Sequence, residues 1–191
     1  MIRKGSEQDS GRIAAIHCRE ISSGFLSQLG PGFLARLYRF IAKSPHSFIF
    51  VSEEKGRVNG FIAGSTDSRR LYREFCHALP LSIFLALLAR MADLNFIRAA
   101  LSIRKHMIGK AAGAQGAELL SIAVSREFQR KGIGCKLVRA LSAEIKSRGR
   151  AECRVLVGKI LGNARFYESA GFKLRSRTAD GRSNIYTLAT R

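Results

Sequence analysis

Two glycines spaced two residues apart, Gly132 and Gly134, close a short basic stretch that reads Gln129-Arg130-Lys131-Gly132-Ile133-Gly134. An apolar run of the length of a buried strand precedes this stretch, from Leu119 to Val124. Apolar residues at helical spacing follow it. A strand that turns into a helix leaves backbone N–H groups without partners at the positive end of the helix dipole. Because glycine lacks a Cβ atom and lets φ become positive, the stretch predicts a phosphate-binding loop.

The spacing of the glycines separates three kinds of phosphate loop. A P-loop requires Gly, four residues and then Gly-Lys-Ser/Thr, which is not found here. A dinucleotide-binding fingerprint requires Gly or Ala three residues after the second glycine, and Leu137 stands there. The remaining pattern is Gln or Arg, two residues, Gly, one residue, and Gly or Ala.

A second group of residues follows at a distance that suits a helix, a strand and a short helix. It reads Asn163-Ala164-Arg165-Phe166-Tyr167-Glu168-Ser169-Ala170-Gly171-Phe172. With the glycine pattern, this aromatic-Tyr pair before Gly-Phe resembles the two signatures of the GCN5-related N-acetyltransferase (GNAT) superfamily. The resemblance covers Glu118 to about Leu174, close to a third of the chain.

The resemblance implies transfer of acetyl from acetyl-CoA to a primary amine, by direct attack in a ternary complex. It assigns the pyrophosphate to the backbone from Arg130 through Lys131, Gly132 and Ile133 to Gly134, with Gln129 shaping the loop. It assigns the pantetheine to the main chain of the preceding strand, at Ile122, Ala123 and Val124. Backbone donors there can also polarise a thioester carbonyl.

The same resemblance places Tyr167 as the acid that protonates the departing sulfur. An ordinary phenol keeps its proton at neutral pH and can donate it. Packing of Tyr167 against the cofactor is the structural alternative. The carboxylate best placed as a base is Glu118, for which a solvated strand end is the alternative.

One position departs from the family pattern. The family usually has Asn seven residues before the tyrosine, and this chain has Ile160 there. The nearest asparagine, Asn163, either caps the short helix or contacts the cofactor. Arg165 is predicted to reach a cofactor phosphate.

The elements that must position these residues are predicted from periodicity and turn signals. A helix capped by Ser6 or Asp9 turns Ile13, Ile16 and Ile21 inward, and a packed His17 is favoured over a catalytic one. A helix begins at Pro31 and ends before Pro45. Strands are expected at 48–52, 58–66, 152–157, 172–177 and 184–188, in addition to 119–124.

Residues from about 67 to 116 form an insertion between the expected third and fourth strands. The apolar stretch 78–108 predicts helices, the first of them apolar on nearly every side. Packing on the chain's own domain is favoured for it. The alternatives are that this segment lines the acceptor pocket, forms a dimer interface or binds to a membrane surface.

Composition bounds the class of protein. The 191 residues suit one domain, 1–191, and 33 Lys plus Arg against 14 Asp plus Glu give a formal net charge of +19. The charge is spread along the chain, which favours a basic globule over a specific nucleic-acid binder. Cys18, Cys76, Cys135 and Cys153 have no metal-ligand spacing, so reduced thiols and no metal site are expected. No signal peptide or membrane span is predicted, which favours a cytoplasmic location.

Taken together, the sequence predicts a single-domain α/β (α+β) fold with a mixed, mostly antiparallel central sheet flanked by helices. The resemblance implies that the protein acts as an N-acetyltransferase. Small amines, amino sugars, protein amines and aminoglycoside-like compounds are left open as acceptors, and so is a homodimer. The rival hypothesis is a non-catalytic basic module of the same fold that binds RNA or an anionic surface.

Overall fold

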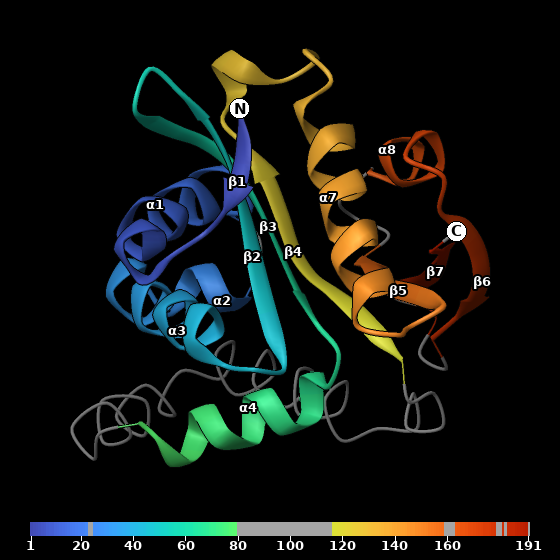
Figure 1. The fold of residues 1–191 in the computed structure, drawn as a ribbon, viewed down its shortest axis with the longest axis horizontal. Helices are drawn as coiled ribbons and strands as arrows, with labels where there is room; N and C mark the ends of the chain where they lie inside the picture. Colours follow the sequence, from blue (N-terminus) through green and yellow to red (C-terminus); the bar gives the residue numbers. More distant parts are fainter. Residues whose placement is uncertain (23–24, 80–115, 159–162, 179–180, 182, 191) are drawn as a thin grey trace.

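The computed structural model describes residues 1–22, 25–79, 116–158, 163–178, 181 and 183–190 (Figure 1). In chain order its elements are β1 Ile2–Lys4, η1 Glu7–Asp9, α1 Ser10–Glu20, α2 Phe25–Gln28, α3 Pro31–Lys43, β2 Ser47–Glu54, β3 Arg57–Ser65, α4 Ser68–His77, β4 Ala117–Val124, η4 Arg126–Phe128, α7 Ile133–Ser147, β5 Glu152–Gly158, α8 Ala164–Ser169, β6 Lys173–Arg177 and β7 Ser183–Ala189. Each strand and helix expected from the described part of the sequence is present, within a few residues of its expected ends.

The strands of the described chain form a seven-stranded sheet in the order β1-β2-β3-β4-β5-β7-β6. Only β4 and β5 run parallel, and every other neighbouring pair is antiparallel. The mixed, mostly antiparallel sheet predicted from the sequence is therefore confirmed. Of the predicted insertion, α4 is helical, whereas the apolar stretch 78–108 lies almost wholly outside the described residues.

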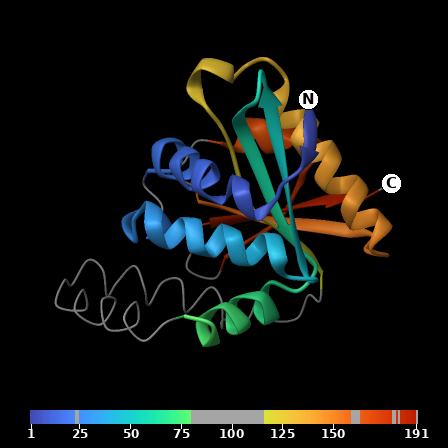
Figure 2. The same cartoon turned by 60° about the vertical axis from the view of Figure 1, so that its left-hand side comes forward.

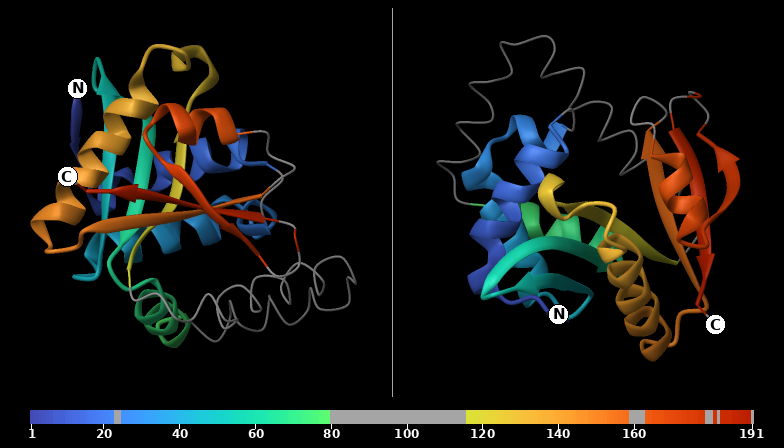
Figure 3. Two further views of the ribbon diagram at one scale, coloured as in Figure 1. Left: turned by 90° about the vertical axis from the view of Figure 1, so that its right-hand side faces the viewer. Right: turned by 90° about the horizontal axis from the view of Figure 1, so that it is seen from above.

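The sheet opens between its two halves. β4 pairs with β5 only through Ala117 with Cys153 and Glu118 with Arg154. Beyond these pairs the two strands separate, as Figure 3 shows from above. The edge of β4 from Leu119 to Val124 therefore faces a gap instead of a neighbouring strand.

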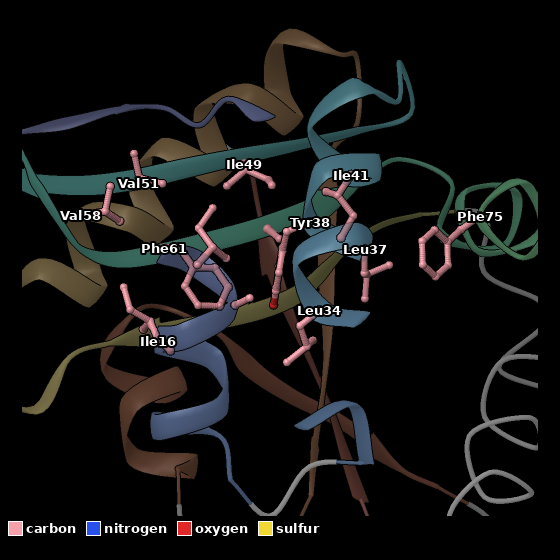
Figure 4. Packing of buried hydrophobic residues seen from close by; sticks show 14 of the residues in the cluster. Ile16, Leu34, Leu37, Tyr38, Ile41, Ile49, Val51, Val58, Phe61 and Phe75 are labelled. Carbon is pink, nitrogen blue, oxygen red and sulfur yellow. The ribbon is translucent and has the colours of Figure 1, made fainter. Parts of the chain in front are cut away.

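Two apolar cores hold the two halves. On one face of β1–β4, α1 and α3 cover a core that includes Tyr38 and Phe61, whose rings meet edge-on at 5.1 Å between centroids (Figures 2 and 4). On the other face, α7 and α8 cover a core that extends from Phe48 and Ile62 to Tyr167 and Tyr186. Because α7 packs on both sides of the gap, it joins the two halves where β4 and β5 do not.

A β-bulge marks the middle of β4. Ala63 of β3 pairs with Ser121 and Gly64 pairs with Leu119, so Leu120 has no partner in the register. A bulge bends the strand that carries it and locally increases its twist. The bend lies just after the last pairing with β5, where the gap begins.

None of the described helices is long and apolar enough to cross a membrane. The four cysteines are free, and burial raises the pKa of Cys153 to about 12.

Candidate active site

The start of α7 offers a row of backbone donors. Gly132 is the N-cap residue in the left-handed region, with φ 75°. The amide of Lys136 donates to the carbonyl of Gly132 over 3.1 Å, which closes the first turn. The N–H groups of Ile133, Gly134 and Cys135 precede that first bond, so they have no partner within the helix. These donors lie at the positive end of a 15-residue helix, which suits an anion.

The two glycines of the loop lack side chains for different structural reasons. A Cβ atom on Gly132 would meet nothing within 4 Å, so the space beside this residue is open. A Cβ atom on Gly134 would lie 2.7 Å from Cε2 of Phe166. Gly134 therefore makes room for the ring of α8, and this contact explains its lack of a side chain better than the approach of a phosphate does.

The loop before α7 is held from behind by side chains. Gln129 donates through Nε2 to the carbonyl of Val124 over 2.8 Å, which ties the loop to the end of β4. The Glu20 carboxylate, at the end of α1, accepts from the amide of Arg126 over 3.2 Å and from Gln129 Nε2 over 3.4 Å. Arg130 has a φ of 60°, which is strained for a residue other than glycine.

The edge of β4 supplies a second set of backbone groups. Ile122 and Val124 turn their side chains into the core under α7, and Ala123 turns into the core under α1. Their main chain runs along the gap up to the loop. A long ligand with amide groups can pair with such an unpaired strand edge while its phosphates lie at the helix start. The residues present therefore fit the expected acetyl-CoA.

Tyr167 lies on α8 among other rings. Its side chain stacks on Tyr186 with 6.2 Å between centroids and meets Phe172 edge-on at 5.6 Å. The residue is 9% exposed, and burial raises the pKa of its phenol to about 12. The phenol therefore holds its proton throughout the neutral range.

Glu118 lies at the closed end of the gap, where β4 and β5 still pair. Its Oε2 accepts from the Ser68 hydroxyl over 2.5 Å and lies 3.6 Å from Nη2 of Arg154. To take a proton from an acceptor, the carboxylate has to give up or share one of these partners. The structure thus joins β4, β5 and α4 at this residue.

Asn163 occupies the N-cap position of α8, but its side chain makes no capping hydrogen bond. Its carbonyl accepts from the amide of Phe166 over 3.1 Å. Asn163 and Arg165 are both exposed. Ile160 lies outside the described residues.

His17 is packed, as expected. It is 3% exposed, and its Nδ1 lies 2.6 Å from the Tyr38 hydroxyl and 3.5 Å from the Ser121 hydroxyl. Burial lowers the pKa of this imidazole to about 4. The group is therefore neutral at neutral pH and supports β4 at the bulge from the α1 side.

The comparisons with known proteins agree with this geometry. Residues 95–174 match the family model described as acetyltransferase (GNAT) domain. Among solved structures, SsHAT has a TM-score of 0.71 at 20% identity, over 100% of this chain and 98% of that chain. The chain has the GNAT fold. A search of curated proteins finds no match to this chain.

Two further GNAT structures have the same architecture. PaiA N-acetyltransferase from Thermoplasma acidophilum, solved in complex with coenzyme A, has a TM-score of 0.63 at 16% identity, over 99% of this chain and 98% of that chain. The ribosomal-protein-S18-alanine N-acetyltransferase from Escherichia coli has a TM-score of 0.54 at 19% identity, over 100% of this chain and 93% of that chain.

Within the GNAT fold, the predicted site residues fall into two groups. In one group, the strand end, 122–124, leads through η4 into 129–134 at the start of α7, where Gly134 faces Phe166 of α8, the helix that begins after Asn163 and carries Arg165 and Tyr167. Glu118 lies apart from the loop, at the far end of β4. Glu20 could not be predicted from the sequence, because a single carboxylate more than a hundred residues from its loop partners forms no motif with them.

Proposed function

We propose that this protein transfers acetyl from acetyl-CoA to a primary amine, by direct attack in a ternary complex. The observation that carries the proposal is the unpaired edge of β4 leading into the open N-terminus of α7 beside Gly132. The GNAT fold and the match to the acetyltransferase domain support it. Acetyl-CoA supplies an activated acetyl thioester when it is bound.

In this proposal, the residues of the chain divide the work. The amides at the start of α7, with Arg130 and Lys131 beside them, hold the pyrophosphate. The main chain of Ile122 to Val124 holds the amide-bearing arm, and exclusion of water from the gap strengthens its hydrogen bonds. Asn163, at the N-cap of α8, and Arg165, in its first turn, are both exposed and are proposed to contact the outer part of the cofactor.

Proton movements are assigned to two side chains. Tyr167 donates a proton to the departing sulfur, because its buried phenol stays protonated at neutral pH. Glu118 accepts the proton of the amine, directly or through water, after exchanging one of its present partners, Ser68 or Arg154. The acceptor itself is not assigned, because the similar structures include both an aminoglycoside 6'-acetyltransferase and a ribosomal-protein-S18-alanine N-acetyltransferase, whose acceptors differ.

A matched pair of substitutions at Gly132 tests the phosphate site. Asn and Asp both tolerate the left-handed region and are nearly equal in size, and the space beside Gly132 is open. Acetyl-CoA is expected to raise the melting temperature of the wild type and of Gly132→Asn. Gly132→Asp adds a negative charge at the anion site, so the shift should be lost there alone.

Equal shifts of the melting temperature in the two variants would contradict the proposal that this loop binds the pyrophosphate. The comparisons do not favour the rival hypothesis of a non-catalytic module that binds RNA or an anionic surface. A melting shift with RNA and none with acetyl-CoA, weakened steeply by salt, would restore it.

A further inference from the structure

Glu20 is a nearly buried carboxylate, and each of its two oxygens accepts a hydrogen bond from the loop before α7. Its side chain is only 6% exposed, although it is the last residue of α1. Its Oε1 accepts from the amide of Arg126 over 3.2 Å and from Arg19 Nε over 2.9 Å. Its Oε2 lies 3.4 Å from Nε2 of Gln129. Both oxygens of a carboxylate from one helix therefore hold a loop that lies 106 and 109 residues further along the chain.

Gln129 extends this contact from Glu20 to the end of β4. The same Nε2 group donates to the carbonyl of Val124 over 2.8 Å. Glu20, Gln129 and Val124 thus connect the end of α1, the loop and the last residue of β4. The loop is fixed to α7 on one side of Arg130 and to this group on the other.

The backbone of the loop needs such support. Arg130 has a φ of 60° without being glycine, and Gly132 follows with a φ of 75°. The left-handed conformation costs free energy for Arg130, which is not a glycine, so surrounding contacts have to hold it there. If the segment from Arg126 to Gln129 moved, Arg130 and the backbone that leads to the open amides of α7 would move with it.

The charge of Glu20 favours a structural role over direct contact with a ligand. A carboxylate next to a pyrophosphate would repel it, and here both oxygens are already occupied by N–H donors. The arrangement keeps the carboxylate turned toward the backbone of the loop.

We infer that Glu20 is a positioning residue, which acts through Arg126 and Gln129 to keep the phosphate loop in its binding conformation before the cofactor arrives. The inference rests on the proposed function for its consequence, the affinity for coenzyme A. Its cause, the hold on the loop, can be measured without any cofactor.

The first measurement is hydrogen exchange of the Arg126 amide in the cofactor-free protein, followed by NMR. Glu20→Ala removes the acceptor of this amide, so exchange should be at least about tenfold faster, with the amides of α3 unchanged. Glu127→Ala is the matched control, because Glu127 also pairs with Arg19 but is 57% exposed. Exchange at Arg126 that is equal in the wild type and Glu20→Ala would overturn the inference.

The second measurement is the affinity for coenzyme A by calorimetry. Glu20→Ala should weaken binding about tenfold, Glu20→Gln should weaken it less, because an amide oxygen still accepts one bond, and Glu127→Ala should bind like the wild type. The double variant Glu20→Ala with Gln129→Ala should lose less affinity than the sum of the two single losses, because the contact between Glu20 and Gln129 is counted in both single variants.

The outcomes separate the inference from the proposed function. A wild type that binds no coenzyme A contradicts the proposed function, while the exchange result still decides whether Glu20 holds the loop. Additive losses in the double variant would show that Glu20 does not act through Gln129, and tighter binding by Glu20→Gln than by the wild type would show that Glu20 acts by its charge; either result would overturn the inference.

Discussion

Tyr167 is the residue proposed to protonate the departing sulfur. Its phenol is buried among rings, and the raised pKa keeps it protonated at neutral pH. Tyr167→Phe removes one oxygen and keeps the packing. We expect turnover to fall about a hundredfold, the usual scale for loss of a general acid, with the affinity for acetyl-CoA unchanged.

Tyr186→Phe is the matched control for this experiment, because Tyr186 is also buried and stacks on Tyr167. Its hydroxyl faces Glu168 at 3.5 Å, so its loss should leave turnover unchanged. Steady-state kinetics with a thiol-release assay measure both variants. Equal turnover in Tyr167→Phe and the wild type would show that Tyr167 is not the general acid.

His17 carries a prediction about stability. Its folded pKa of about 4 lies below the ordinary value of 6.5, so the unfolded chain binds the proton more readily. The stability that depends on neutral His17 is complete above pH 6.5 and is lost as the pH falls toward 4. By linkage, about 2 kcal/mol should disappear between pH 7 and pH 5.

Denaturant unfolding at the two pH values measures this loss. His17→Gln keeps a polar partner for Tyr38 but does not titrate, so its stability should depend less on pH. His77→Gln, at an exposed position of α4, is the control. Asp9 does not interfere, because its pKa is lowered to about 2 by Arg3 and its contribution is lost only below pH 3.8. Parallel pH profiles for His17→Gln and the wild type would refute the assignment.

At the scale of elements, the contact between α7 and α8 decides how the start of α7 is packed. A Cβ atom on Gly134 would meet the ring of Phe166 at 2.7 Å. Gly134→Ala should therefore lower the free energy of unfolding by about 1–3 kcal/mol through overpacking. Phe166→Leu in the same chain should restore part of it, because the smaller side chain leaves room.

Gly11→Ala provides the comparison for the Gly134 variant. Gly11 lies inside α1 and a Cβ atom there would meet nothing within 4 Å. That substitution should stabilise the protein by up to about 1 kcal/mol through helix propensity alone. A Gly134→Ala variant as stable as the wild type would show that Phe166 moves aside without loss.

The elements show what the sequence could and could not predict. Pro31 at a helix start, the glycines after a strand and the apolar stripes are local signals, and the corresponding helices and strands are present. The role of Gly134 toward Phe166 and the hold of Glu20 on Gln129 arise only when distant segments meet. Periodicity within one window contains no information about such pairs, so they required the fold.

At the scale of the whole molecule, the formal net charge of +19 acts on the proposed anionic cofactor before any contact forms. A field of one sign raises the association rate of an oppositely charged ligand, and salt screens it over a Debye length of about 10 Å at 0.1 M. The rate of acetyl-CoA association should therefore fall about tenfold or more between about 50 and about 500 mM salt, and dissociation should change less.

Stopped-flow kinetics with S-acetyl-pantetheine, which lacks the phosphates, provide the control for this prediction. Its association should hardly depend on salt, because it carries no charge for the protein to attract. If the association rates of both ligands fall equally with salt, the ions act on the protein itself and do not screen its attraction for a charged ligand. The excess of basic residues would then have no part in capturing the cofactor, and the local donors of α7 would account for its binding alone.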